Sequence, residues 1–425
     1  MVLFLKDFLM TDRIALVQAL KGILTEEISL SDVKNQIDAD DRNFANMLIL
    51  SSLRQLTFIR QEVFPLFIKR KIPHKQQILT YILSLGITEL LFLDTPDYAV
   101  INSYVEVAKK LSDRFGASFV NAVLHNIAKN KNSLLANRKQ KYFSKEFLKI
   151  LSKDYTHKQV ENMEEFIIIE PPLDLTPKMG SDIHFKDEIL LPNKSIRLPY
   201  HTKITNLEGY QEGLWWVQDT ASTLPVKCLS NIKGKKVLDI CAAPGGKTAQ
   251  LLDAGAIVTA VDISQTRLNR LKENVGRLGF SDNLQIIEAD ARCFVSKDKF
   301  DIILLDAPCS ATGTFRRHPE IIHTKTQKDV LKQALLQQEI LDHIVQFLEP
   351  YGVLVYATCS LAKAEGESQI FTFLQRHPDF KITPISLPYL SESVTKEGFL
   401  RVLPQHFKQF GGIDGFFVAL LQRKI

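Results

Sequence analysis

The sequence predicts a multidomain protein with an all-helical N-terminal region, a small α/β middle region and a C-terminal α/β, Rossmann-like domain with a mostly parallel sheet. Three observations predict this architecture. The length of 425 residues exceeds a single ordinary core. Apolar residues recur at spacings of three and four in the N-terminal region, whereas strand-like and helix-like segments alternate from Lys233 onward. We expect the regions to span 1–131, 139–230 and 231–425.

The N-terminal region lacks strand-like alternation, and turn signals at Pro73, Asp94–Pro96 and Gly116 divide it into helices. Its longest apolar tract, Ile78–Leu93, spans 16 residues and contains Glu89, which favours a buried helix over a membrane span. The start of the chain is an apolar stretch broken by charged residues, which is typical of an extension leading into a first helix rather than a signal peptide. We therefore expect a cytoplasmic protein without a membrane partner.

The composition is that of a soluble globular protein, with 45% hydrophobic and 24% charged residues. The five cysteines are odd in number and none are paired as CxxC, which argues against a disulfide framework and against a zinc site. The net charge of +5 names no partner, but basic residues cluster at Lys69–Lys75 and Lys129–Lys153. Such clusters are either solvated helix faces or a source of non-specific attraction to nucleic-acid phosphates.

The middle region has short apolar runs, Phe166–Glu170 and Ile189–Pro192, that indicate a small α/β unit. The C-terminal region ends in Phe399–Pro404 and Gly415–Arg423, which predict an antiparallel hairpin. Before that hairpin, strands and helices are expected to alternate in the order Val237–Ile240, a helix to Leu252, Ile257–Asp262, a helix over Gln265–Leu278, Leu284–Asp290, Asp301–Asp306, a helix over about Gln327–Leu348, and Val353–Ala357.

The segment Lys235–Leu252 reads as strand, Gly-rich turn and helix, the layout that holds a nucleotide-like cofactor. Gly246-Lys247-Thr248 ends like a phosphate-binding Walker A loop, but Cys241 stands where that pattern needs a glycine, so an NTPase is disfavoured. Small residues let the backbone approach a ligand closely, and this favours a methyl-donor site. The expected donor contacts in the turn are Cys241, Ala242, Ala243, Pro244, Gly245, Gly246 and Lys247.

Three carboxylates stand at the ends of the first three predicted strands. Asp239 ends the first strand, and Asp262, 23 residues later, ends the second, where a carboxylate accepts hydrogen bonds from ribose hydroxyls. Asp290 ends the third strand, from which a side chain can reach an adenine amino group. A single aspartate could simply cap a helix, but three in register with a Gly-rich turn favour a donor site containing Asp262 and Asp290.

Two cysteines 50 residues apart follow two further predicted strands, Cys309 after Ile302–Leu305 and Cys359 after Val353–Ala357. The carboxyl ends of parallel strands form the ligand crevice of an open α/β sheet, so both sulfurs are expected in one pocket. With the donor turn, they indicate a methyltransferase with a cysteine nucleophile. Cys241 is expected to contact the donor through its backbone, and the remaining cysteines, Cys228 and Cys293, to be small buried hydrophobes.

The segments Val237–Gly246, Asp306–Gly313 and Thr358–Glu367 resemble the RNA 5-methylcytosine methyltransferases of the NOL1/NOP2/Sun family, and Trp216–Ser222 resembles the segment leading into that family's catalytic domain. Upstream, Ile87–Lys110 together with Phe119–Ile127 resembles a NusB-type RNA-binding domain. The combination is similar to the bacterial Sun/RsmB subfamily over nearly the whole chain. The resemblance implies S-adenosyl-L-methionine as donor and 16S rRNA or a small-subunit precursor as acceptor, at the cytosine numbered 967.

The resemblance also implies roles for individual residues. Cys359 would be the nucleophile, and Cys309 would assist breakdown of the covalent adduct. Asp306 would face both the donor and the target base. Arg316, Arg317 and His318 are candidate contacts to RNA phosphates. The chain departs from the family where Ile322-His323 replace the lysine and tryptophan that often follow, so no substrate contact is carried over beyond Glu320.

Two other functions remain open from the residues alone. An amino-methyltransferase acting on an exocyclic nitrogen carries an Asp/Asn-Pro-Pro-aromatic loop at the same strand end, but here that loop is Asp306–Cys309, and direct nitrogen transfer leaves Cys359 without a role. A non-catalytic, NusB-like RNA-binding factor with a vestigial catalytic domain is the second alternative. The complete set of donor-site residues and both cysteines argue against such degeneration.

Overall fold

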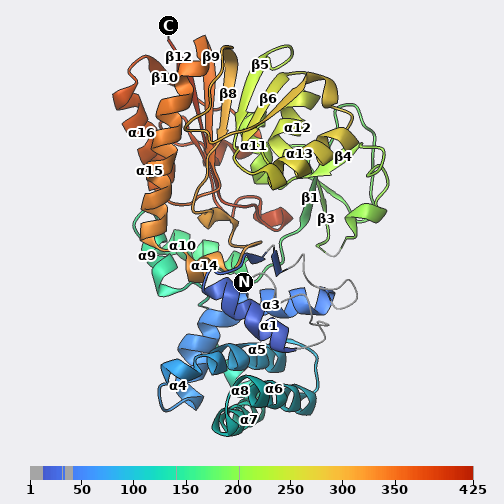
Figure 1. The fold of residues 1–425 in the computed structure, drawn as a ribbon, viewed down its shortest axis with the longest axis vertical. Helices are drawn as coiled ribbons and strands as arrows, with labels where there is room; N and C mark the ends of the chain where they lie inside the picture. The colour runs from blue at the N-terminus through green and yellow to red at the C-terminus, as the bar shows by residue number, and fades with distance from the viewer. Residues whose placement is uncertain (1–12, 31, 34–41, 140, 201, 425) are drawn as a thin grey trace. The chain divides into compact units, whose positions relative to one another are not determined.

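The computed structural model describes residues 13–30, 32–33, 42–139, 141–200 and 202–424 (Figure 1). The chain divides into two compact units, Met1–Leu148 with His318–Thr324, and Lys149–Arg317 with Lys325–Ile425. Both sheets of the protein belong to the second unit. The three region boundaries expected from the sequence remain predictions, and the expected extension at the chain start lies outside the described residues.

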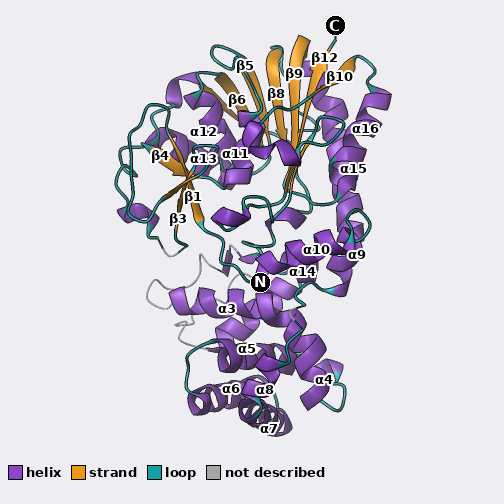
Figure 2. Cartoon of the chain, turned by 180° about the vertical axis from the view of Figure 1, so that it is seen from behind, coloured by secondary structure: helices purple, strands orange, loops and turns teal. Residues whose placement is uncertain are grey.

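The first unit contains helices and no strand among its described residues, as predicted (Figure 2). Its α-helices are α1 (Arg13–Leu24), α3 (Arg42–Phe58), α4 (Phe64–Phe67), α5 (Ile78–Phe92), α6 (Asp97–Leu111), α7 (Arg114–Lys129), α8 (Lys131–Ala136) and α14 (Ile321–Thr324), with a π-helical turn at Ile59–Val63 after α3. The helix α9 (Lys145–Leu151) follows α8 along the chain.

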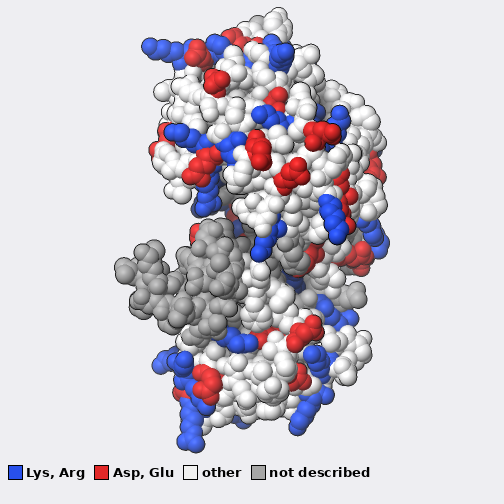
Figure 3. All heavy atoms as spheres, turned by 90° about the vertical axis from the view of Figure 1, so that its right-hand side faces the viewer, with Lys and Arg blue, Asp and Glu red and all other residues white. Residues whose placement is uncertain are grey.

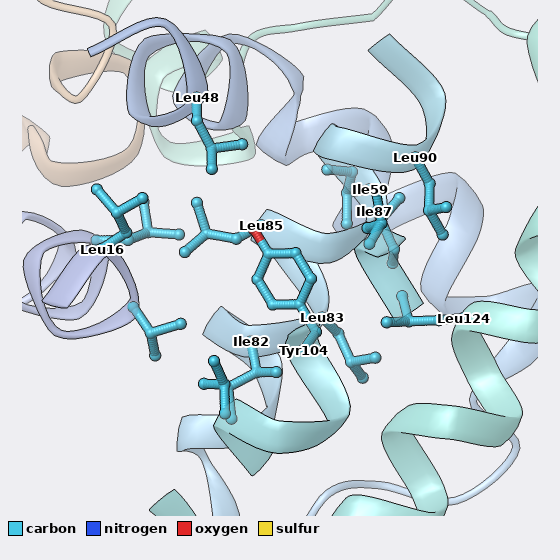
Figure 4. Close-up of a cluster of buried hydrophobic side chains, with 14 of the residues drawn as sticks. Leu16, Leu48, Ile59, Ile82, Leu83, Leu85, Ile87, Leu90, Tyr104 and Leu124 are labelled. Carbon is cyan, nitrogen blue, oxygen red and sulfur yellow. The ribbon is translucent and has the colours of Figure 1, made fainter. Parts of the chain in front are cut away.

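The predicted apolar tract forms α5, whose side chains lie in the core of this unit. Figure 4 shows its leucines and isoleucines surrounded by apolar side chains of α1, α3, α6 and α7. Glu89 is fully buried in this helix, where it accepts hydrogen bonds from Arg13 Nη2 at 2.6 Å and from Tyr104 Oη at 3.0 Å. A buried charge is tolerated when it is paired and hydrogen-bonded, so the acid does not interrupt the helix.

The turn expected at Gly116 is wrong, because Gly116 lies within the first turn of α7. The helix begins after Asp113, whose carboxylate caps it by accepting a hydrogen bond from the Gly116 backbone nitrogen at 2.8 Å. Glycine suits this position because a Cβ there would lie 2.3 Å from Ser112 Oγ. The glycine therefore marks a close approach of Ser112 rather than the end of a helix.

The predicted middle region contains α10 (His157–Glu164) and a four-stranded sheet in the order β2-β3-β1-β4. Every pairing in this sheet is antiparallel. Its strands are β1 (Leu173–Pro177), β2 (Ile189–Leu190), β3 (Ile196–Leu198) and β4 (Trp215–Val217). The apolar run Phe166–Glu170 forms no strand, since it continues α10 as a 3₁₀ turn in which Phe166 and Ile167 are buried.

The large sheet has the order β10-β12-β9-β8-β5-β6-β7, with β11 paired to β12. Its strands are β5 (Lys236–Ile240), β6 (Ile257–Asp262), β7 (Leu284–Glu288), β8 (Phe300–Asp306), β9 (Leu348–Thr358), β10 (Phe380–Thr383), β11 (Leu400–Val402) and β12 (Phe416–Arg423). Five neighbouring strands, in the sheet order β9-β8-β5-β6-β7, run parallel to one another. The predicted hairpin is present as β11 and β12, but β12 also pairs antiparallel with β9 and β10.

Helices cover both faces of this sheet (Figure 1). They are α11 (Thr220–Lys227), α12 (Gly246–Asp253), α13 (Gln265–Arg277), α15 (Gln327–Ile344) and α16 (Glu367–Arg376). Adjacent residues of β5 enter different cores, Val237 with α11–α13 and Leu238 with α15 and α16. This two-sided burial explains why the parallel strands read as continuous apolar runs.

The strand order reverses between β5 and β8, because the chain passes from β5 to β6 on one side and reaches β8 on the other. In open α/β sheets the ligand crevice lies at the carboxyl ends of the strands at such a reversal. The fold therefore directs attention to the residues that follow β5, β8 and β9.

No helix in the described part of the chain is long and apolar enough to cross a membrane. Within the same residues, no three His, Cys, Asp or Glu side chains are grouped so that they could hold a metal ion. On the face shown in Figure 3, basic and acidic side chains are interspersed. Charges of one sign therefore form no large continuous patch among the described residues visible on that face.

Candidate active site

A pocket of about 400 Å³ lies at the carboxyl ends of β5 and β8. Every residue predicted in the donor turn, from Cys241 to Lys247, lines it, together with Asp239 and Asp306. Cys241 and Gly245 adopt φ of 61° and 102°, and a Cβ on Gly245 would lie 2.8 Å from Leu271 Cγ. The turn is therefore tightly curved, and glycine is required at its second strained position.

Asp239 is fully buried at the pocket wall. Its Oδ2 accepts a hydrogen bond from Thr248 Oγ1 at 2.6 Å, while Oδ1 has no partner among the described residues. Burial raises the pKa of Asp239 to about 7. An unpartnered buried carboxylate oxygen beside a pocket is an acceptor for a cationic group of a ligand.

Two predicted site residues that line the pocket form an ion pair. Lys247 Nζ lies 2.7 Å from Asp306 Oδ2, and the ammonium also lies 5.4 Å from the centre of the Phe416 ring. The lysine side chain is 10% exposed and the aspartate 32%. The pair thus leaves part of the Asp306 carboxylate accessible from the pocket.

The two other predicted donor contacts, Asp262 and Asp290, lie outside the Gly-rich turn. Asp262 ends β6, where its carboxylate accepts hydrogen bonds from Ala243 N at 3.1 Å and Ser264 N at 3.0 Å, so it braces the donor turn. Asp290 forms an ion pair with Arg292 at 2.6 Å, and the hydrogen bond from Arg292 lowers the Asp290 pKa. Among the described residues that line the pocket, neither aspartate appears.

The two predicted catalytic cysteines meet, although 50 residues separate them, but neither is among the described residues that line the pocket above. Cys309 follows β8, Cys359 follows β9, and their Sγ atoms lie 3.4 Å apart. The hydrogen bond with Cys359, reinforced by burial, raises the pKa of Cys309 well above its ordinary value. Cys309 is therefore held as a neutral thiol that can give or share a proton with its neighbour.

The other cysteines fit their expected roles unevenly. Burial raises the pKa of Cys241 and of Cys228 to about 12, so both remain unreactive thiols at neutral pH. The expectation that Cys293 is buried is wrong, because this side chain is exposed. It follows β7 in a turn at the protein surface, where no apolar strand covers it.

The candidate RNA contacts need correction at Arg316. This residue is 1% exposed, and its Nη2 donates a hydrogen bond to Gly411 O at 2.6 Å, so the guanidinium stabilises the interior and does not face phosphate. Arg317 pairs with Asp414 and lies 3.7 Å from Asp219, although its side chain is 34% exposed. His318 is 45% exposed and lies 3.3 Å from Glu320.

The residues that depart from the family pattern are packed in the first unit. Ile322 is fully buried, and His323 Nε2 donates to Leu53 O at 2.7 Å. Burial lowers the His323 pKa to about 4, so the imidazole is neutral near pH 7. These positions thus serve packing.

The structure adds one site residue that sequence reasoning missed. Glu365 lies six residues after Cys359 and is fully buried, with its carboxylate bonded to both cysteine-bearing loops. The sequence offered one signal for this residue, because Glu365 is an acidic residue within the family-like segment Thr358–Glu367. Sequence alone could not show that its side chain turns inward.

Sequence models of known families match both parts of the chain. The model described as 16S rRNA methyltransferase RsmB/F matches residues 226–422, and the NusB family model matches residues 10–129. Ribosomal RNA small subunit methyltransferase B of Citrobacter koseri is 33% identical over 398 residues, covering 87% of this chain and 92% of that protein. Its Vibrio cholerae counterpart is 31% identical over 446 residues, covering 99% of each.

Solved structures share the fold. The crystal structure of PH0851 matches with a TM-score of 0.73 at 22% identity, covering 96% of this chain and 98% of the other. A methyltransferase homologue from Pyrococcus horikoshii matches with a TM-score of 0.54 at 24% identity, covering 66% and 99%. The fold and site define a Rossmann-like methyltransferase domain joined to a NusB-type helical domain. The chain belongs to the RsmB family of 16S rRNA methyltransferases.

Proposed function

We propose that the protein transfers a methyl group from S-adenosyl-L-methionine to carbon 5 of a cytosine in 16S rRNA, at the position numbered 967, through a covalent cysteine adduct. The observation that carries this proposal is the pair of sulfurs, 3.4 Å apart, at the ends of adjacent parallel strands. Direct transfer of a methyl group to a nitrogen needs no thiol. Activation of carbon 5 needs one thiol, and a second thiol can assist release of the product. The names of the relatives support small-subunit rRNA as the acceptor.

The pocket residues fit the donor. The unpartnered Asp239 Oδ1 suits the donor's ammonium group, and the turn around Gly245 lets backbone atoms approach it closely. Asp262, which ends β6, and Asp290, two residues after β7, are assigned to the ribose and the adenine by their strand positions, although neither is among the described residues that line the pocket. When bound, S-adenosyl-L-methionine would supply an electrophilic methyl group, and the electron pair of the broken methyl–sulfur bond would leave with S-adenosyl-L-homocysteine.

Cys359 is assigned as the nucleophile by its position in the family motif. Its thiolate forms a bond to carbon 6 of the flipped cytosine, and the displaced π electrons make carbon 5 nucleophilic enough to form the bond to the methyl group. Asp306 is assigned a hydrogen bond to the cytosine edge, because it ends β8 and its carboxylate is partly exposed. Loss of the carbon 5 proton then lets the ring expel the Cys359 sulfur and regain aromaticity. Cys309 is assigned to this release, because its neutral thiol lies beside the departing sulfur.

Bisulfite sequencing of 16S rRNA from cells with and without the gene tests the proposal. We expect one protected cytosine, at position 967, that becomes convertible when the gene is deleted. Purified protein with labelled donor and small-subunit rRNA should yield 5-methylcytosine by mass spectrometry. A product methylated on nitrogen, or the same modification in both strains, would refute the proposal.

A further inference from the structure

A buried carboxylate sits behind the cysteine pair. Glu365 closes the 3₁₀ turn Lys363–Glu365 that follows β9, and its side chain is fully excluded from solvent. The proposed chemistry gives this carboxylate no step. Burying a carboxylate is costly unless hydrogen bonds compensate, so its placement calls for a structural or functional reason.

The hydrogen bonds of Glu365 reach both cysteine loops at once. Oε1 accepts from Ser310 N at 2.8 Å, and Oε2 accepts from Ser360 Oγ at 2.6 Å and from Ser310 Oγ. Ser310 directly follows Cys309, and Ser360 directly follows Cys359. One carboxylate thus joins the two residues that stand next to the two sulfurs.

A third element braces the same carboxylate. Gln337 of α15 donates to Glu365 Oε1 at 3.1 Å and to Pro308 O at 2.9 Å, and it accepts from Tyr356 Oη at 3.0 Å. The single hydroxyl hydrogen of Tyr356 is shared between Gln337 Oε1 and Glu365 O, which lies 2.9 Å from the hydroxyl oxygen. Because these donors are neutral, hydrogen bonds and not an ion pair hold the carboxylate. The number of these hydrogen bonds fixes its orientation.

We propose that Glu365 is a positioning residue that fixes the distance between the Cys309 and Cys359 sulfurs by joining their loops through Ser310 and Ser360. The proposal rests on the function proposed above for this cysteine pair. The Cys309 pKa is raised first by the hydrogen bond with Cys359 and by burial, and the Glu365 carboxylate adds to this shift when it is ionised. Glu365 itself touches neither sulfur nor substrate and acts only through the loops.

Two substitutions separate geometry from charge. Glu365→Gln keeps the size and one carbonyl oxygen for Ser310 N, and its amide can donate to the serine hydroxyls, which rotate to accept. Glu365→Ala removes the hydrogen bonds by which the Glu365 carboxylate joins the two loops. Asp174→Asn is the matched control, since Asp174 is a buried carboxylate of the same unit that accepts hydrogen bonds from Arg197 and Thr220 N.

The test measures how readily the two sulfurs join in the free, full-length protein. Diamide oxidises two thiols to a disulfide as its azo group gains two hydrogens, and peptide mapping by mass spectrometry identifies the Cys309–Cys359 product. We expect Glu365→Ala to slow this reaction by about tenfold or more, because the sulfurs lose their enforced proximity. Glu365→Gln and Asp174→Asn should react near the parental rate.

A second readout tests the charge. The pH midpoint for alkylation of Cys309 by iodoacetamide, resolved by peptide, should fall in Glu365→Gln but not in Asp174→Asn. Thermal melting confirms that each variant is folded at the assay temperature. A folded Glu365→Ala protein that oxidises at the parental rate would overturn the proposal, and so would equal slowing by Asp174→Asn.

The outcome is distinguishable from failure of the proposed function, because both readouts use protein without RNA. Parental oxidation of Glu365→Ala together with intact rRNA methylation would remove Glu365 and leave the function standing. If the oxidation rates are as expected but the protein methylates no cytosine, the positioning role of Glu365 stands and the proposed function fails.

Discussion

At the scale of single residues, the surroundings raise the pKa of two groups of the site, Asp239 and Cys309. Asp239 is buried with one oxygen unpartnered, and Cys309 is held as a thiol by its neighbour. Perturbed groups of this kind concentrate where chemistry or binding occurs. Two predictions follow from the individual atoms involved.

The first concerns the division of labour between the sulfurs. If Cys359 attacks and Cys309 assists release, Cys309→Ala should still methylate its target but remain bound to it. We expect a protein–RNA complex that survives denaturing gel electrophoresis, with structured 16S rRNA as substrate. Cys359→Ser should form no complex and lose methylation more than about a hundredfold, since a serine hydroxyl is far too weak an acid to replace a thiolate.

The control for this trap is the double variant Cys309→Ala, Cys359→Ala, in which the complex should be absent. A trapped complex in the double variant, or one in Cys359→Ala alone, would mean that the roles of the two sulfurs are assigned wrongly.

The second prediction is a pH dependence of stability caused by Asp239. Its folded-state pKa of about 7 exceeds the ordinary value of 3.8, so the folded protein binds more protons than the unfolded chain between these limits. Its burial therefore costs progressively more stability as pH rises from about 4 to about 7. Asp239→Asn removes this cost, and its melting temperature relative to the parent should rise across that window. A constant difference from pH 4 to pH 8, measured by calorimetry, would contradict the assigned pKa.

At the scale of elements, the loops after β8 and β9 are joined by backbone contacts as well as by Glu365. Gly313 N donates to Cys359 O at 2.9 Å, and Gly415 N donates to Gly313 O at 2.9 Å. A Cβ on Gly313 would lie 2.2 Å from Gly415 O. The start of β12 is therefore part of the support for the cysteine loops.

Gly313→Ala should accordingly push these loops apart. We expect a loss of about 1–3 kcal/mol in the free energy of unfolding, as for other overpacked sites, and a fall in methyl transfer of more than about tenfold. Gly276→Ala in α13 is the control, because its Cβ meets no atom within 4 Å. It should gain up to about 1 kcal/mol from helix propensity and keep parental activity. Denaturant unfolding and methyl-transfer assays measure both, and parental activity in a folded Gly313→Ala protein would contradict this account.

At the scale of the whole molecule, a helical unit accompanies the catalytic one, and residues 318–324 belong to the helical unit although the chain on both sides belongs to the other. The exposed residues Lys69, Arg70 and Lys71 lie in a loop of the helical unit. With the NusB family match, this loop is a candidate contact to rRNA phosphates.

Replacing Lys69, Arg70 and Lys71 by alanine should weaken rRNA binding and flatten its salt dependence. Each lost phosphate contact lowers the slope of log K against log salt by roughly 0.7–0.9. Binding titrations at several salt concentrations measure the slope, and the affinity for the methyl donor serves as the control because it should not change. An unaltered slope would place the RNA contacts elsewhere.

Much of the architecture could be predicted because it follows from local patterns. Continuous apolar runs between helical segments identify parallel strands buried on both faces, and the small residues from Ala242 to Gly246 identify a ligand-binding turn. The cysteines at Cys309 and Cys359 were expected to meet because parallel strands present their carboxyl ends at one edge. These features depend on residue type and spacing, which the sequence displays directly.

Other features depend on which segments distant along the chain become neighbours. The insertion of β12 beside β9, the inward turn of Glu365 and the burial of Arg316 each require a partner far away in sequence. A charged residue near a catalytic motif looks the same in the sequence whether it faces solvent or closes a buried hydrogen-bond network. By itself the sequence determined the layered α/β sheet, the helical first unit and the Gly-rich turn that lines the pocket. Only the tertiary structure decided which charged side chains support that site from within, because burial is a property of the packed chain.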